Sequence, residues 1–89
     1  MSKDLYKDIS DCIGLVDREI NLHKQNIEAD GNIETLENIK YQLDNMRKYM
    51  SPLKYMPNYN YILRDSLWDY LKIADELLRV YHQYIKIID

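Results

Sequence analysis

Apolar residues recur at alternating steps of three and four along three stretches of the chain, and this spacing is typical of an α-helix with one buried face. The first stretch predicts a helix over residues 2–29 and the second predicts a helix over residues 33–50. A Gly-Asn pair at 31–32 separates them, because glycine readily ends a helix and asparagine caps the next one. Two prolines stiffen a bend at 51–60, after which a third helix is expected over residues 60–87.

The third stretch carries more apolar residues than one helix face can hold. Its apolar positions cover roughly 200° of the helical circumference, whereas a surface helix buries a stripe only about 100° wide. We therefore expect an all-α protein, an antiparallel three-helix bundle that self-associates through its C-terminal helix as a homodimer. The predicted self-association residues are Ile73, Val80, Tyr84 and Ile87. The alternative is a monomer in which the two other helices cover the whole apolar face.

Composition places the chain among small soluble proteins. Its 89 residues allow one domain, and only two glycines and two prolines interrupt the pattern, which disfavours a sheet with many turns. The net charge of −3 is too small for bulk attraction to nucleic acid or to an anionic membrane. Cys12 has no second cysteine to pair with, so we expect a cytoplasmic protein in which this thiol packs as a small hydrophobe. No stretch approaches the roughly 20 apolar residues of a membrane span.

No set of residues in the chain predicts a reaction. The sequence has no glycine-rich phosphate loop, zinc-ligand spacing or nucleophile elbow. Glu19 and His23 are four residues apart, but the helical di-metal motif needs Glu-x-x-His in two copies together with further carboxylates. We therefore expect a protein that is not an enzyme and that holds neither a cofactor nor a metal.

Tyrosines and basic residues are interleaved around the predicted bend, in a segment without a single acidic residue. The candidate binding residues there are Arg47, Lys48, Tyr49, Lys54, Tyr55, Tyr59, Tyr61 and Arg64. Tyrosine supplies a large contact area at low entropic cost, which is why protein-binding surfaces favour it. The alternative is a stiff loop whose tyrosines pack over the end of the bundle.

A second mixed stripe follows the polar side of the third predicted helix. Arg64, Trp68, Arg79 and His82 share one face of that helix by their spacing. Arginine and tryptophan are enriched in the residues that dominate binding energies at protein interfaces. The alternative is that Trp68 covers the edge of a neighbouring helix while the charged groups are simply solvated.

These patterns favour a small binding module whose partner is another protein, contacted by the bend and by the Arg64–Trp68–Arg79 face. The alternative function is binding of a nucleotide or a single-stranded nucleic acid, whose bases would stack on the tyrosines. Four basic residues in a net-acidic chain make that electrostatic footprint weak. In size and helix count the chain resembles bacterial immunity proteins, antitoxins and phage-borne inhibitors, and this resemblance is one of architecture alone.

Overall fold

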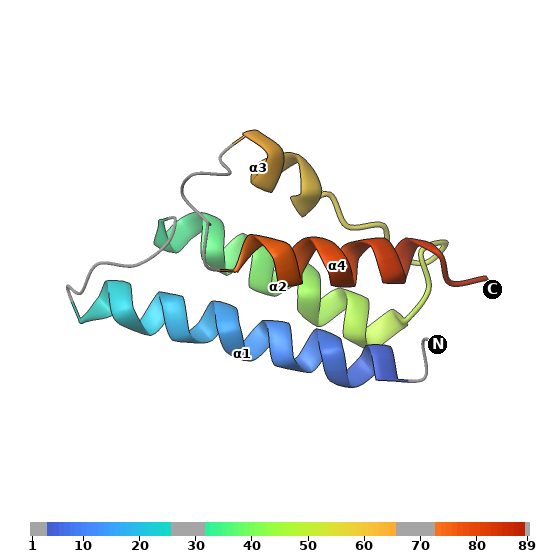
Figure 1. The fold of residues 1–89 in the computed structure, drawn as a ribbon, viewed down its shortest axis with the longest axis horizontal. Helices are drawn as coiled ribbons and strands as arrows, with labels where there is room; N and C mark the ends of the chain where they lie inside the picture. The colour runs from blue at the N-terminus through green and yellow to red at the C-terminus, as the bar shows by residue number, and fades with distance from the viewer. Residues whose placement is uncertain (1–3, 26–31, 66–72, 89) are drawn as a thin grey trace.

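The computed structural model describes residues 4–25, 32–65 and 73–88, and every regular element in these ranges is a helix. The helices are α1 (Leu5–Lys24), α2 (Ile33–Tyr49), α3 (Tyr59–Asp65) and α4 (Ala74–Ile85). The direction of the chain reverses from each helix to the next, and α4 packs along α1 (Figure 1). The expectation of an all-α protein is therefore confirmed for the described residues.

The helices α1 and α2 form an antiparallel pair that buries the two apolar stripes read from the sequence. The buried stripe residues are Leu5, Ile9, Cys12, Ile13, Val16 and Ile20 of α1, with Leu36, Ile39, Leu43 and Met46 of α2. Asn32 caps α2, because its side-chain oxygen accepts a hydrogen bond from the Thr35 N–H at 2.9 Å. The Lys40 ammonium joins the two helices through a 2.7 Å contact with Asp17. The last residues of the predicted first helix lie outside the described residues.

The third predicted helix requires a correction. Instead of one helix over residues 60–87, the structure has two helices, because α3 ends at Asp65 and α4 begins at Ala74. Residues 66–72 between them are not described, and α3 runs opposite to α4 on the outer side of the bundle (Figure 1). The description as a three-helix bundle is therefore replaced by three longer helices with a short fourth one packed beside them.

The predicted self-association surface also requires a correction. Within a single chain Ile73 is 3% exposed, while Val80 and Tyr84 are fully buried, and Ile87 is half-buried against the same core. In the described part of this arc, Ile73, Val80 and Tyr84 are therefore covered by the same molecule and are not exposed to a second copy, whereas Ile87 keeps part of its surface. The burial of the first three removes the physical reason for expecting a dimer through them.

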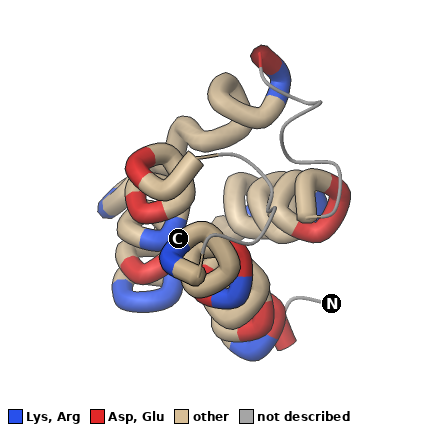
Figure 2. Tube along the Cα trace, turned by 90° about the vertical axis from the view of Figure 1, so that its left-hand side faces the viewer, with Lys and Arg blue, Asp and Glu red and all other residues tan. Residues whose placement is uncertain are grey.

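Charged residues of both signs are interspersed along the outer sides of the longer helices (Figure 2). The short helix α3 differs, because its charged positions are confined to its C-terminal end, at Arg64 and Asp65. Both signs thus occur along each of the longer helices, which agrees with the small net charge.

Candidate functional site

The bend between α2 and α3 begins at a residue in a conformation that side chains rarely adopt. Met50 ends α2 with φ 49° and ψ 38°, in the left-handed region, and its N–H still donates to the Met46 carbonyl at 2.8 Å. Only a few per cent of residues other than glycine adopt a positive φ. The chain then turns around Ser51, whose carbonyl accepts hydrogen bonds from the N–H groups of Lys54 and Tyr55.

The buried hydroxyl of Tyr84 fixes this turn to α4. It accepts a hydrogen bond from the Ser51 N–H at 3.2 Å, and it donates toward the carbonyl oxygens of Ser51 and Tyr55, each 2.8 Å away. Because this contact is largely shielded from water, losing the hydroxyl would remove hydrogen bonds that water does not readily replace. The start of the bend is therefore fixed by a residue about thirty positions further along the chain.

A second anchor fixes the end of the bend to α2. The side-chain oxygen of Gln42, a buried residue of α2, accepts a hydrogen bond from the Asn58 N–H at 2.8 Å. The Gln42 amide nitrogen in turn donates to the Asn38 side chain at 2.9 Å. Because its amide oxygen and its amide nitrogen are both hydrogen-bonded, Gln42 has a defined orientation and fixes the backbone just before α3.

Large apolar side chains project into solvent from this anchored backbone. Leu53 is 86% exposed and Met56 is 55% exposed, although neither is polar. Beside them the rings of Tyr49 and Tyr55 stack with centroids 6.3 Å apart, and the Lys48 ammonium lies 5.2 Å from the Tyr49 ring. We refer to Tyr49, Leu53, Tyr55 and Met56 as the bend surface.

Two of the predicted binding arginines are already engaged within the molecule. Arg79 contacts Glu76 at 2.8 Å and reaches Asp8 of α1 at 3.4 Å. Its hydrogen bond holds the pKa of the Glu76 carboxyl below its usual value. Arg47 contacts Asp44 at 3.5 Å and donates to the Ser10 hydroxyl of α1 at 3.1 Å.

Tyr59 was expected on the binding surface but lies in the core. Its side chain is fully buried, and its hydroxyl donates to the Leu77 carbonyl at 2.6 Å, which joins the start of α3 to α4. Burial raises the pKa of the Tyr59 phenol far above its ordinary value. Tyr59 therefore positions α3 and is not exposed to a partner. Trp68, the centre of the predicted second stripe, lies outside the described residues.

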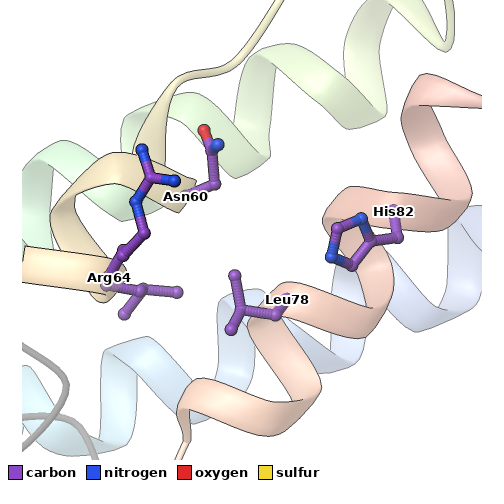
Figure 3. A pocket seen from close by; sticks show the side chains of 5 residues that line it. Asn60, Arg64, Leu78 and His82 are labelled. Carbon is purple, nitrogen blue, oxygen red and sulfur yellow. The ribbon is translucent and has the colours of Figure 1, made fainter.

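A pocket separates α3 from α4 and brings together two of the predicted residues. Its volume is about 380 Å³, and its lining is Asn60, Leu63, Arg64, Leu78 and His82. Arg64 projects from α3 and His82 from α4 on opposite sides of the pocket (Figure 3). Tyr61, another predicted residue, is exposed on α3 beside it, with the Arg64 guanidinium 5.2 Å from its ring.

The predicted binding residues are thus distributed over two regions. Lys48, Tyr49 and Tyr55 gather at the bend, with Lys54 exposed there, while Tyr61, Arg64 and His82 gather at the pocket. Sequence reasoning missed Leu53 and Met56, although an apolar residue next to each of the two prolines was a visible signal of exposure on a turn. It also missed Asn60 and Leu78, which lie together only because α3 folds back along α4.

Among the described residues, no group of three or more His, Cys, Asp or Glu side chains is placed to hold a metal ion. No helix in the described ranges combines the length and the apolarity that crossing a membrane requires. Comparisons of the chain with protein-family models, with curated proteins and with solved structures found no match.

Proposed function

We propose that this protein binds a protein partner through the bend surface. The observation that carries the proposal is that Leu53 and Met56 are held out in solvent by a backbone that two buried side chains anchor. Burial of apolar area is the main favourable term in protein association, at about 25 cal/mol for each Å² removed from water before the costs of binding are subtracted. A surface made of four neighbouring apolar or aromatic side chains can supply the centre of such an interface.

The anchoring adds to the affinity that exposure alone would give. A flexible loop loses conformational entropy when it docks, and each immobilised side chain costs about 0.5–1.5 kcal/mol. Here the backbone around Ser51 and Tyr55 is already hydrogen-bonded to Tyr84, so the ordering of the backbone happens during folding and not on binding. The tyrosine rings contribute further, since their stacking limits the rotamers that they lose on binding.

A nucleic acid is the weaker candidate partner for the same surface. Of the four basic residues around the bend, Arg47 is directed to Asp44 and to α1, and Arg64 lies at the pocket. Lys48 and Lys54 remain, and two phosphate contacts give little electrostatic affinity at physiological salt. A nucleic-acid complex would also weaken steeply as salt is raised, whereas an apolar interface would not.

The test is a paired affinity capture with quantitative mass spectrometry, in which the baits are the wild-type chain and the double variant Leu53→Ser, Met56→Ser. Truncating residues at the centre of an interface costs about 2 kcal/mol or more, which is roughly a thirtyfold loss of affinity. We therefore expect proteins that the wild type retains and the double variant does not. Both side chains are exposed, so the melting temperature should be nearly unchanged.

The matched control is Tyr6→Ser on α1, which removes a large side chain that is 56% exposed and lies outside the bend surface. It should retain the same proteins as the wild type. Equal recovery of every protein by the wild type and the double variant would exclude the bend surface as a docking site. Recovery of nucleic acid that is lost at moderate salt would favour the alternative function.

A further inference from the structure

We propose that the pocket between α3 and α4 binds a small carboxylic acid with an apolar body and a hydroxyl next to its carboxylate. This site is separate from the bend surface and does not depend on the function proposed above. Its volume of about 380 Å³ lies toward the lower end of the roughly 300–1,000 Å³ that ligand pockets occupy. A compact organic acid therefore suits it better than a nucleotide.

The charges at the pocket favour an anion. Within the described part of the chain, neither Arg64 nor His82 has a carboxylate within ion-pair distance, in contrast to Arg47 and Arg79. The planar guanidinium of arginine presents two parallel N–H groups, which match the two oxygens of a carboxylate. The imidazole of His82, across the pocket on α4, can donate a further hydrogen bond (Figure 3).

The remaining lining residues favour an apolar body. Leu63 of α3 is fully buried, and Leu78 of α4 is half-buried. A ring or a short alkyl chain packed on Leu78, above the buried Leu63, would leave its carboxylate at the Arg64 side. The arrangement of an apolar floor with a few convergent polar groups is the usual form of a small-molecule site.

Asn60 supplies the reason to expect a hydroxyl. Its side-chain oxygen is covered from solvent and accepts no hydrogen bond from any described residue. Buried polar atoms of folded proteins are nearly always paired. Because Asn60 lines the pocket, rotation of its side chain would present this oxygen to a donor bound there. Asn60 precedes Arg64 by four residues, one helical turn, so the two side chains project from the same side of α3 (Figure 3). With the Asn60 side chain turned in this way, a hydroxyl adjacent to the carboxylate would reach its oxygen while Arg64 holds the acid group.

A matched series of four phenyl compounds tests each part of this assignment by titration of the isotope-labelled protein followed by NMR. Mandelate carries the carboxylate and the hydroxyl, phenylacetate lacks the hydroxyl, 2-phenylethanol lacks the charge and phenethylamine reverses it. We expect mandelate to bind several-fold more tightly than phenylacetate. Both acids should shift the signals of Leu63, Leu78 and His82, with a Kd on the order of 1 mM for ligands this small.

Three variants assign the roles of the residues. Arg64→Met should weaken both acids about tenfold, because it removes the charge from an exposed side chain while keeping most of its apolar stem. Asn60→Ala should abolish the preference for mandelate over phenylacetate. Arg18→Met, a change of another exposed arginine on α1, should leave all affinities as in the wild type. Circular dichroism would verify that each variant is folded.

The proposal is overturned if the alcohol or the amine binds as well as the acids, or if Arg64→Met and Arg18→Met have equal effects. Shifts confined to residues outside the pocket would also overturn it. An unchanged preference for mandelate in Asn60→Ala would remove the hydroxyl from the assigned ligand. Because none of these readouts involves the bend surface, failure here would leave the protein-binding proposal unaffected, and the reverse is also true.

Discussion

Cys12 is the one cysteine of the chain, and its thiol faces α4 from the middle of α1. The side chain is almost completely buried, and its sulfur lies 3.7 Å from the Glu76 carbonyl oxygen. Burial raises the pKa of the Cys12 thiol from 9.0 to about 12, with a smaller contribution from the charge of Glu76. Since the thiolate is the reactive form of cysteine, this environment makes the thiol inert while the protein is folded.

We expect the native protein to react with iodoacetamide at pH 8 about a thousandfold more slowly than the unfolded chain, from the difference in thiolate population alone. The stability has a matching pH dependence. The thiol of the unfolded chain ionises above pH 9 while the folded one stays protonated, so the free energy of unfolding falls as the pH rises from 9 to 12. The full contribution of this thiol is present below pH 9.

Alkylation followed by mass spectrometry measures the rate of reaction with iodoacetamide. Chemical denaturation at a series of alkaline pH values measures the free energy of unfolding. A Cys12→Ala variant provides the control, because it lacks this ionisation and should lose less stability between pH 9 and pH 11. Rapid alkylation of the folded protein at pH 8 would show that the thiol is not buried as the structure has it.

At the scale of elements, the bend and α4 form one unit although some thirty residues separate them. The Tyr84 hydroxyl provides the connection through Ser51 and Tyr55. We expect Tyr84→Phe to lower the free energy of unfolding by about 1–3 kcal/mol, because the ring still fills its site while buried polar groups lose the hydrogen bonds of its hydroxyl. The amide hydrogen of Ser51 should also exchange faster with solvent.

Denaturant unfolding and hydrogen exchange measure these two effects. The matching control is Tyr49→Phe, which removes a hydroxyl from a tyrosine at the surface, where such changes stay within about 0.5 kcal/mol. If the two variants were equally stable, the contact between Tyr84 and the bend would be unimportant for folding.

The first two helices could be predicted because their apolar spacing and their end signals agree. Asn32 caps α2, and Ser51 follows the end of that helix, as the sequence indicates. The division of the third predicted helix into α3 and α4 could not be predicted, because the apolar spacing continues from Leu63 to Ala74 without a proline or glycine. A wide apolar arc can be buried by a partner chain or by a chain that folds back on itself, and periodicity does not distinguish the two.

The candidate site was predictable only where its residues are close along the chain. Tyr49 and Tyr55 could be placed together from their density around the bend. The contact between Arg79 and Asp8 could not be predicted, because these residues are 71 positions apart and meet only through the packing of α4 on α1. The pocket likewise joins residues of two helices that the sequence presents as one.

At the scale of the whole molecule, a single copy of the chain buries the side chains that seemed to need a second one. Ile73, Val80 and Tyr84 belong to one core with α1 and α2. If the same residues formed a dimer interface, the stability would depend on protein concentration, as it does for obligate dimers.

We expect the melting temperature to stay constant over roughly a hundredfold range of protein concentration, because folding of one chain completes the core. Val80→Asp should abolish folding at every concentration, since it places an unpaired charge in a fully buried position. Calorimetry and light scattering test both expectations. A melting temperature that rises with protein concentration would indicate a dimer interface at these residues of α4. A Val80→Asp variant that folds as a monomer would indicate the same.

The contact of Tyr84 with the bend has a consequence for how long the protein survives in a cell. If the proposed partner binds the bend surface, it also holds α4 in place, so its binding free energy would add to the stability of a chain this small. Copies without that partner would open more often and would be the first to meet proteases. The abundance of the protein would then follow that of the molecule it binds, and surplus copies would be cleared without any dedicated signal.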